Sequence, residues 1–316
     1  MSSSEPLYIK NYIGLTGDTP IRFIASDVDG TLVNDAKSVD PEVVNAVRAA
    51  RESGIRVAIA SGRAWHEMDD VIAAMPCLRY FVCTNGAYVM DKEEQKELVH
   101  ISFDKTRAID LVRKLMTYGV FVEAYVKAEI FGQYPTVGNE TLQADHFFRA
   151  NIRPFILKTR TMVPDLLAHL KSLPEGPEKI QIFYGDERIR ERILADLRDD
   201  FQGAATDGKG RERFYDVLES SEGNLEFVLP HTTKGTAVEA LANHWGYTPD
   251  EVMTIGDSEN DLSMIRFAGA SVAMGNARDN VKAAARYETT DNNNYGVARA
   301  LYSAIAYNRE LETKQK

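Results

Sequence analysis

The chain has few cysteines and no long uncharged apolar run. Its two cysteines, Cys77 and Cys83, form no Cys-x-x-Cys pair and have no histidine nearby at metal-ligand spacing. We therefore expect two reduced structural thiols, not a disulfide framework or a zinc site. No segment approaches the roughly 18 apolar residues of a membrane span, and Met1–Asp18 lacks the basic and apolar stretches of a signal peptide. These absences predict a cytoplasmic protein with no membrane partner.

Positive charge is also scarce. Lysine and arginine number 37 against 47 aspartates and glutamates, which gives a formal net charge of -10. Nucleic-acid phosphates reward clustered lysine and arginine, so this balance predicts no nucleic-acid partner. An anionic substrate would need a local positive site. The length of 316 residues is typical of about two domains, and a hydrophobic fraction of 44% is ordinary for a folded protein.

Strand-like and helix-like segments alternate in the first part of the chain. They are short apolar runs at 21–26, 55–60 and 80–84, separated by helical patterns at 41–53 and 64–75. This alternation predicts a doubly wound parallel sheet, the Rossmann-like type of α/β fold. Later segments are expected to complete the same sheet: strands at 225–229, 252–255 and 271–273, with helices at 234–245 and 295–306.

The middle of the chain has a different pattern. A hairpin at 88–102 is followed by mixed helices and strands, namely helices at 104–118, 139–150, from 164 and 187–199, and strands at 120–126, 129–134 and 179–184. Such mixing predicts a separate α+β domain inserted into the first. We therefore expect an N-terminal extension at 1–18, a catalytic core at 19–89 and 217–316, and an inserted cap domain at 90–216.

Polar clusters follow the predicted strands of the core, where open parallel sheets bind their ligands. The clusters are Asp27 with Asp29, Ser61 with Gly62, Lys234 at a helix start, and Gly256-Asp257 with Asn260 and Asp261. Converging carboxylates of Asp27, Asp29 and Asp257 would repel one another without a cation, and an all-oxygen site suits Mg²⁺. With Mg²⁺, a lysine, a hydroxyl and backbone amides, the site would hold a phosphoryl group.

In order and spacing, these clusters resemble the four motifs of haloacid dehalogenase-like phosphatases. The motifs are Asp27-Val28-Asp29-Gly30-Thr31-Leu32, Ser61-Gly62-Arg63, Lys234-Gly235 and Gly256-Asp257-Ser258-Glu259-Asn260-Asp261. The match is best to the Cof-type group, whose type IIB cap is inserted between the second and third motifs. Two further segments, Thr84-Asn85-Gly86-Ala87 and Ala273-Met274-Gly275-Asn276-Ala277, also resemble that group. The resemblance covers about residues 20–306.

The resemblance implies a role for each motif residue. Asp27 would attack phosphorus and form an aspartyl phosphate, while Asp29 would protonate the leaving oxygen and then activate water. Mg²⁺ would be held by the Asp27 carboxylate, the Asp29 backbone carbonyl and Asp257. The phosphate group would be held by Val28, Ser61, Gly62, Lys234 and Asn260. Thr31 and Asp261 would support the site, with Asp261 orienting Lys234, and Arg63 and Asn85 are candidate substrate contacts.

Each cluster alone has a simpler structural interpretation. Residues 27–30 could form a polar turn, Lys234 a solvated surface charge, Arg63 a surface ion pair and Asn85 a turn residue. Four clusters in a fixed order, each at a strand end or helix start, favour the functional interpretation. In the predicted cap, four side chains could face a substrate, but no motif places them: Tyr134, His146, Arg149 and Arg153.

We therefore expect a Mg²⁺-dependent phosphomonoester hydrolase that acts on small phosphorylated metabolites, such as sugar or cofactor phosphates, as a monomer or homodimer. One alternative is a phosphosugar mutase, but Ser61-Gly62-Arg63 resembles the hydrolase form of the second motif. Another is a non-catalytic phosphometabolite-binding protein, which loss of Asp27, Asp29 or Asp257 would favour. All three aspartates are present. The inserted domain is expected to be a mobile cap that selects the leaving group.

Overall fold

The computed structural model describes residues 13–127, 129–138, 140–150, 152–198, 214–219 and 223–314. The chain divides into two compact units. The first contains the described residues of Met1–Arg63, Met68–Val99 and Thr233–Lys316, and the second those of Ala64–Glu67 and His100–Thr232. Most of the predicted N-terminal extension, residues 1–12, lies outside the described residues. In its remainder Ile13 is buried and donates its N–H to Oγ of Ser303 at 2.9 Å.

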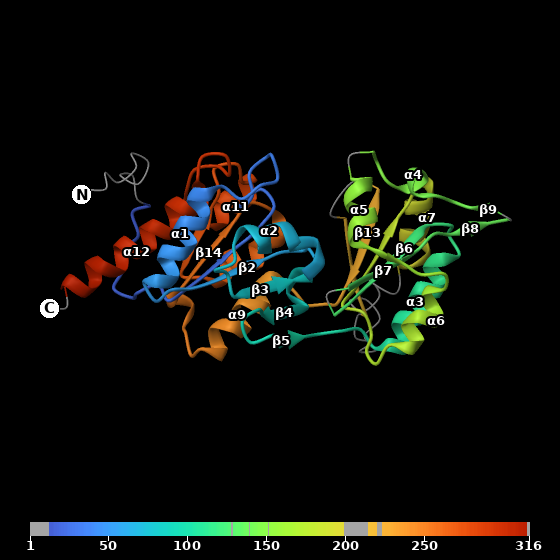
Figure 1. Ribbon diagram of the computed structural model, residues 1–316, viewed down its shortest axis with the longest axis horizontal. Coiled ribbons are helices and arrows are strands. Elements are labelled where there is room, and N and C mark those ends of the chain that lie inside the picture. The colour runs from blue at the N-terminus through green and yellow to red at the C-terminus, as the bar shows by residue number, and fades with distance from the viewer. Residues whose placement is uncertain are drawn as a thin grey trace. The chain divides into compact units, whose positions relative to one another are not determined.

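The first unit is built on an eight-stranded sheet with the order β16-β15-β14-β1-β2-β3-β4-β5 (Figure 1). Neighbouring strands from β16 to β3 run parallel, and β4 pairs with β3 in the antiparallel sense. The strands are β1 (Phe23–Ser26), β2 (Arg56–Ala60), β3 (Tyr80–Cys83), β4 (Tyr88–Asp91), β5 (Lys96–His100), β14 (Val252–Gly256), β15 (Ala270–Ala273) and β16 (Tyr287–Glu288). The central strands are buried on both faces, as an all-parallel arrangement requires.

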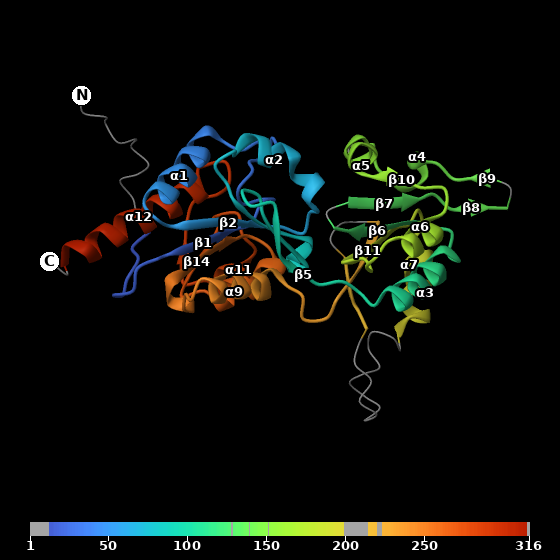
Figure 2. The same ribbon diagram turned by 60° about the horizontal axis from the view of Figure 1, so that its bottom comes forward.

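Helices cover both faces of this sheet: α1 lies on one side of β1 and β2, and α9 lies on the other (Figure 2). Alternate strand residues such as Phe23 and Ala58 pack with Val238 and Leu241 of α9. The helices are α1 (Pro41–Glu52), α2 (Asp69–Ala74), α9 (Lys234–His244), α10 (Leu262–Phe267), α11 (Asp279–Ala284) and α12 (Gly296–Lys314). The predicted helix at 64–75 is a 3₁₀ turn, Trp65–Met68, followed by the short α2.

The second unit contains a six-stranded sheet with the order β10-β7-β6-β11-β13-β12. Its strands are β6 (Phe121–Val126), β7 (Glu129–Gln133), β10 (Thr161–Met162), β11 (Lys179–Phe183), β12 (Asp216–Leu218) and β13 (Asn224–Val228), and β8 (Thr136–Val137) and β9 (Glu140–Thr141) form a separate pair. The helices are α3 (Lys105–Met116), α4 (Ala144–Phe147), α5 (Arg153–Thr159), α6 (Leu166–Ser172) and α7 (Glu187–Asp196).

Each face of this second sheet has its own apolar cluster. Val122 and Ile182 point into a core formed with α3, α6 and α7. Their neighbours Phe121 and Phe183 point the other way, into an aromatic cluster that includes Phe147 of α4 and Ile156 of α5. The predicted fold class, a doubly wound parallel sheet with an inserted α+β domain, is confirmed.

Two parts of the sequence-based organisation are wrong. The strand predicted at 225–229 to resume the first sheet is β13, which pairs antiparallel with β11 and β12 in the second unit. A five-residue run with apolar residues at alternate positions fits either sheet, so its pattern could not decide between them. The inserted segment of the second unit accordingly runs from His100 to Thr232, not from 90 to 216, and the hairpin strands β4 and β5 belong to the core sheet.

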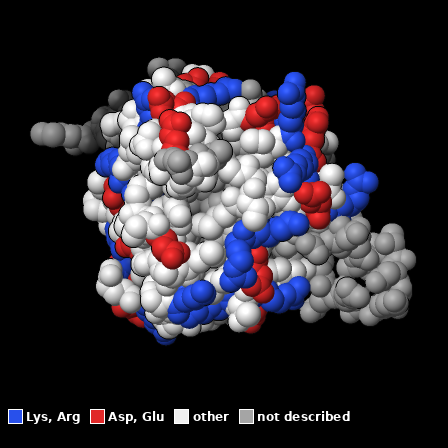
Figure 3. Space-filling view, turned by 90° about the vertical axis from the view of Figure 1, so that its right-hand side faces the viewer, with Lys and Arg blue, Asp and Glu red and all other residues white. Residues whose placement is uncertain are grey.

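The helical pattern predicted at 139–150 is also shorter than expected. Among the described residues of that range, only Ala144–Phe147 is helical, and the next helix, Arg153–Thr159, was not predicted. Among the described residues, no helix is both long and apolar enough to cross a bilayer. Positive and negative side chains are intermixed on the face shown in Figure 3.

Candidate active site

The first strand ends at Asp27, which is held at the carboxyl edge of the core sheet. The Asp27 N–H donates to the Ile255 carbonyl of β14 at 2.9 Å, extending the parallel pairing one residue past β1. The chain then turns tightly, because the Val28 carbonyl accepts N–H groups from Thr31, Leu32 and Val33. This turn keeps residues 27–31 together at the point where open parallel sheets bind ligands.

Lys234 and two aspartates form a buried charge cluster at this edge. The Lys234 Nζ lies 2.5 Å from Oδ1 of Asp27 and 2.7 Å from Oδ1 of Asp261, with its side chain 1% exposed. Burial by itself lowers the pKa of Lys234, but the charges of Asp261 and Asp27 outweigh burial and raise that pKa. Lys234 is therefore a permanent cation between two carboxylates.

Asp27 retains one unused oxygen. Its Oδ2 is buried and has no hydrogen-bond partner among the described residues. Burial, followed by the negative charge of Asp261, raises the pKa of Asp27 to about 8, and the nearby Lys234 only partly opposes this. A buried carboxylate oxygen without a donor is costly, so Oδ2 points to a missing positive or electrophilic partner.

Three carboxylates, including that of Asp27, meet at this edge of the sheet. Asp27, Asp257 and Asp261 each offer one oxygen, and these atoms lie within 4.8 Å of one another. Both oxygens of Asp261 are already used, since Oδ1 accepts from Lys234 and Oδ2 accepts the Asp257 and Ser258 N–H groups at 2.9 and 3.0 Å. Asp257 accepts a hydrogen bond from Oγ1 of Thr31 at 3.2 Å, and burial followed by the Asp261 charge raises its pKa.

These residues fit a divalent metal ion of the Mg²⁺ type. The available donors are hard carboxylate oxygens, which Mg²⁺ prefers, and the cluster carries more negative than positive charge. The carboxylates of Asp27 and Asp257 are the groups that a cation would neutralise. Asp261 is committed to Lys234 and to two backbone amides.

Asp29 lies two residues beyond Asp27 but points away from this cluster. Its carboxylate is 44% exposed and forms a bidentate pair with Arg63, with Nε 2.8 Å from Oδ2 and Nη2 2.6 Å from Oδ1. Lys37 lies 3.5 Å from the same Oδ1. Burial alone raises the pKa of Asp29, but the hydrogen bonds and charge of Arg63 outweigh it and hold the pKa below its ordinary value. The three aspartates predicted to converge therefore do not all meet through their carboxylates.

The second motif and Asn85 lie in neighbouring loops, which follow β2 and β3. Ser61 is buried, its N–H donates to Val82, and its carbonyl accepts the Asn85 N–H at 2.9 Å. A Cβ added to Gly62 would lie 3.1 Å from Oδ1 of Asn85, so that side chain sits directly over Gly62. Asn85 has a φ of 53° and its Oδ1 accepts from Nδ2 of Asn260 at 3.3 Å.

The structure thus gathers the predicted motif residues at one edge of the core sheet in two groups. One contains Asp27, Lys234, Asp257 and Asp261 with Thr31, and the other joins Ser61, Gly62, Asn85 and Asn260. The sequence did not single out Lys37 beside Asp29, since a lone lysine carries no spacing signal. It also assigned no role to Asn276, whose side chain donates to the Gly30 carbonyl at 2.8 Å. The cap candidates Tyr134, His146, Arg149 and Arg153 belong to the second unit.

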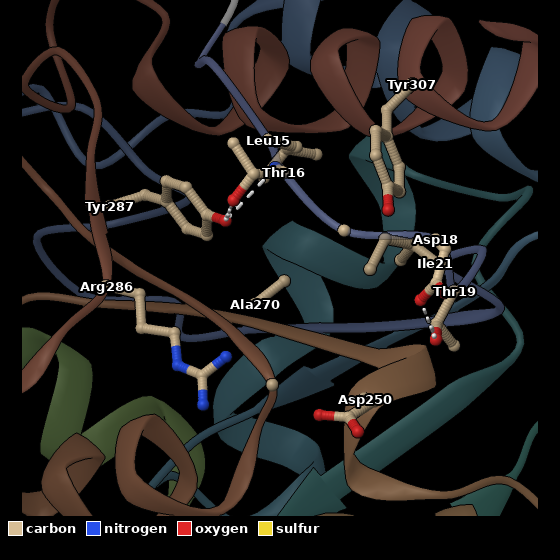
Figure 4. Close-up of a pocket in the computed structure, with 12 residues that line it drawn as sticks. Leu15, Thr16, Asp18, Thr19, Ile21, Asp250, Ala270, Arg286, Tyr287 and Tyr307 are labelled. Carbon is tan, nitrogen blue, oxygen red and sulfur yellow. Dashed lines mark hydrogen bonds between the residues drawn. The ribbon is translucent and has the colours of Figure 1, made fainter. Parts of the chain in front are cut away.

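A separate cavity of about 220 Å³ lies in the first unit near the amino-terminal ends of β1 and β15 (Figure 4). Its lining includes Asp18, Asp250, Arg286, Tyr287 and Tyr307, and Thr16 contacts the Tyr287 hydroxyl at 3.3 Å. None of the predicted catalytic residues lines it. Because active sites of parallel sheets lie beyond the carboxyl ends of the strands, this cavity is not the candidate active site.

Comparisons with known proteins give the family of the chain. A profile of the haloacid dehalogenase-like hydrolases matches residues 24–301. Phosphatase YwpJ of Bacillus subtilis is 31% identical over 287 residues, covering 88% of this chain and 98% of that protein. Pyridoxal phosphate phosphatase YbhA of Escherichia coli is 26% identical over 289 residues, covering 90% of this chain and 98% of that protein.

A similar solved structure is a haloacid dehalogenase-like hydrolase from Bacteroides thetaiotaomicron. It has a TM-score of 0.73 and 27% identity, and the match covers 89% of this chain and 98% of that chain. The similarity therefore includes both units and is not confined to the core.

Proposed function

Because the chain belongs to the haloacid dehalogenase-like hydrolase family, we propose that it hydrolyses phosphomonoesters of small metabolites through an aspartyl phosphate on Asp27, with Mg²⁺ as cofactor. The observation that carries this proposal is the buried Oδ2 of Asp27, which has no partner among the described residues although Oδ1 is held by Lys234. One oxygen is fixed and the other is available, as a positioned nucleophile requires.

In the first step, Oδ2 of Asp27 bonds to phosphorus while the bond from phosphorus to the ester oxygen breaks. Lys234 orients Asp27 through Oδ1 and contributes positive charge near the phosphoryl oxygens. Asp261 accepts a hydrogen bond from the same ammonium, so two carboxylates hold Lys234 in place. The leaving oxygen takes a proton from Asp29, and the product is an alcohol with an aspartyl phosphate on Asp27.

In the second step, a water molecule attacks the phosphorus of the aspartyl phosphate. Asp29 takes a proton from that water, the bond between phosphorus and the Asp27 oxygen breaks, and inorganic phosphate is released. Arg63 keeps Asp29 ionised in the substrate-free protein, which is the form this step needs. The first step instead requires a protonated Asp29. Because Arg63 lowers the pKa of Asp29, their pairing determines how readily Asp29 holds the proton that it gives to the leaving oxygen.

The second group of motif residues is suited to binding the phosphoryl group. The amides of Val28 and Gly62, the Ser61 hydroxyl and the Asn260 amide would donate to phosphate oxygens, and Asn85 and Arg63 would contact substrate near them. The carboxylates of Asp27 and Asp257 and the Asp29 carbonyl would hold Mg²⁺. When bound, Mg²⁺ would neutralise the carboxylates and polarise the phosphoryl oxygens.

The substrate class is a small phosphorylated metabolite, such as a sugar phosphate or a cofactor phosphate. The pyridoxal phosphate phosphatase among the relatives supports this class, and the match extends over the inserted unit as well as the core. Most core motif residues would contact the phosphoryl group or the metal ion, so we propose that selection among leaving groups comes mainly from the inserted unit. This assigns His100–Thr232 the role of a cap.

The test is release of inorganic phosphate from a panel of sugar and cofactor phosphates, with Mg²⁺ and after exhaustive chelation. We expect turnover that requires the metal, trapping of radioactive phosphate on the wild-type protein after acid quench, and no trapping on Asp27→Asn. A matched control is Asp250→Asn, an exposed aspartate at the opposite edge of the sheet. Full activity in the chelated protein would contradict the proposed metal requirement. Labelling of Asp27→Asn would contradict the assignment of Asp27 as the nucleophile.

A further inference from the structure

Asn276 links the loop that follows the nucleophile to a distant part of the chain. Its Nδ2 donates to the Gly30 carbonyl at 2.8 Å, across 246 residues of sequence. Its Oδ1 accepts the Asn292 N–H at 3.1 Å. Both polar atoms of this exposed side chain are therefore used, and both of its partners are backbone groups.

The loop that carries Asn276 is also fixed to the strand end that carries Asp257. The Met274 N–H donates to the Gly256 carbonyl and the Arg278 N–H donates to the Asp257 carbonyl, each at 3.0 Å. Residues 274–278 thus contact the Asp257 backbone on one side and the Gly30 backbone on the other. They therefore connect the loop that follows Asp27 with the loop that carries Asp257.

Asn292 and Asn293 extend the same connection to the next turn of the nucleophile loop. Nδ2 of Asn292 donates to the Val33 carbonyl and to Oδ1 of Asp35, both at 3.1 Å, and Nδ2 of Asn293 donates to Oδ2 of Asp35 at 3.0 Å. Oδ1 of Asn293 in turn accepts the Asp35 N–H at 3.1 Å. Hydrogen bonds from Asn293 and Asn292 hold the pKa of Asp35 below its ordinary value, so Asp35 remains an acceptor.

The segment from Gly30 to Asp35 is therefore held at both ends by asparagine side chains from after β15 and β16. At its Gly30 end, the segment packs closely against Asp257, a residue of the proposed metal site. Gly30 has a φ of 78°, and a Cβ placed there would lie 2.5 Å from Oδ2 of Asp257. Thr31, the next residue, donates to Oδ1 of the same carboxylate.

We propose that Asn276 is a positioning residue for the active site and that Asn276, Asn292 and Asn293 form an asparagine clamp on the nucleophile loop. The clamp fixes the Gly30–Thr31 peptide, one residue beyond Asp29, whose carbonyl is a proposed metal ligand, and so keeps Asp27 and Asp29 in register with Asp257. This inference rests on the proposed function. Asn276 itself touches neither substrate nor metal in this assignment. Small displacements of catalytic groups cost roughly 100-fold in rate, so the hydrogen bond to Gly30 is expected to matter for turnover.

Asn276 could instead have a purely structural role, which is to hold the exposed turn at Asn292. Two substitutions distinguish this structural role from the positioning role. Asn276→Asp keeps an acceptor for the Asn292 N–H but loses the donor to the Gly30 carbonyl. Asn276→Ala loses both bonds. Asn280→Ala is the matched control, because the side chain of this exposed asparagine of α11 donates to Glu259, at 3.4 Å, and not to the nucleophile loop.

We expect Asn276→Asp and Asn276→Ala to lower kcat by about 10-fold to 100-fold with KM changed less than about 3-fold, and Asn280→Ala to match the wild type. Thermal unfolding without metal should be nearly unchanged. Asn292→Ala, which removes the bonds to Val33 and Asp35, should lower kcat by a smaller factor. Wild-type kcat in Asn276→Asp, with loss only in Asn276→Ala, would assign Asn276 to the Asn292 turn and overturn the clamp.

A second readout does not depend on turnover. The rise in unfolding temperature that Mg²⁺ alone gives the substrate-free protein should be smaller in Asn276→Ala than in the wild type and in Asn280→Ala, because the proposed ligand carbonyl is less well held. An equal Mg²⁺-induced rise in all three proteins would overturn the clamp. If the wild-type protein releases no phosphate from any substrate, the proposed function fails while this measurement still decides on the clamp.

Discussion

Lys234 donates to Asp27 across 207 residues of sequence, and the two side chains are 1% and 5% exposed. The same ammonium donates to Asp261, so one buried cation pairs with two buried carboxylates. Such a cluster keeps its charge only if each member stays in place, because an unpaired buried charge costs several kcal/mol. Folding stability and catalytic activity therefore depend on the same residues in this site.

Asp27→Asn should abolish turnover while leaving a folded protein that still binds substrate. The amide keeps the shape of the carboxyl group but lacks a charged oxygen to attack phosphorus, so we expect a loss of at least about 1,000-fold in kcat. Rapid-quench assays and the circular dichroism spectrum measure the two effects. A variant that kept a substantial share of the wild-type rate would end the covalent mechanism. Asp29→Asn should instead slow both formation and hydrolysis of the intermediate.

The same substitution should stabilise the metal-free protein at alkaline pH. The pKa of Asp27 is raised to about 8, so the folded state binds this proton more tightly than the unfolded chain, where the ordinary value is 3.8. The resulting stability is fully present below the unfolded pKa and is lost as the pH rises through about 8. The amide of the Asp27→Asn variant does not titrate. Unfolding in urea from about pH 4 to pH 9 should therefore shift in favour of Asp27→Asn as the pH increases, and saturating Mg²⁺ should shrink that shift.

Lys234→Met should be the most destabilising single substitution among the motif residues. The thioether has similar length but leaves Asp27 and Asp261 buried without their cation, which costs about 3 to 5 kcal/mol. Lys37→Met is the control, because Lys37 is exposed and lies 3.5 Å from Asp29. Denaturant titrations should show a large loss for the first and under about 1 kcal/mol for the second. Equal small losses would mean that Lys234 does not hold the cluster together.

Gly30→Ala should impair the site by moving Asp257. At a φ of 78° an alanine is strained by roughly 1 kcal/mol, and its Cβ would meet a carboxylate oxygen at 2.5 Å. Gly54→Ala is a matched control, since Gly54 has a φ of 83° but no described atom within 4 Å of its Cβ position. Both variants should lose similar stability from strain, and only Gly30→Ala should need more Mg²⁺ for half-maximal activity. The same Mg²⁺ requirement in both would show that backbone strain alone is responsible.

The sequence predicted the parts of this protein that depend on local pattern. Asp27, Lys234 and Asp261 come at the end of a strand or the start of a helix, and parallel pairing of β1 with β14 then brings them to one edge. Features that depend on pairing between strands distant in the sequence were harder to predict. The alternation in Asn224–Val228 fits a strand of either sheet, and only its partners β11 and β12 assign it to the second unit.

Side-chain direction was also beyond a pattern of residue types. Asp27 and Asp29 sit two positions apart, yet one carboxylate faces Lys234 and the other faces Arg63. The motif containing Asn276 was recognised without a role, because its bond to Gly30 joins loops 246 residues apart. Such contacts have no signature in a single sequence, since an exposed asparagine after a strand is usually a turn residue.

The last prediction concerns the second unit, which we propose acts as the cap that selects the leaving group. The chain enters it between Val99 and His100 and leaves it between Thr232 and Thr233, so these are the positions for a graft. Replacing His100–Thr232 with the corresponding segment of a relative of different preference, such as the pyridoxal phosphate phosphatase, keeps every core motif residue. Phosphate release from a substrate panel should then rank substrates as the donor enzyme does, while the Mg²⁺ requirement and the need for Asp27 remain. The control is this chain's own segment rejoined through the same cloned junctions, which should preserve the original ranking. A folded chimera that retains the original ranking would place substrate selection in the core, because only His100–Thr232 differs between the two proteins.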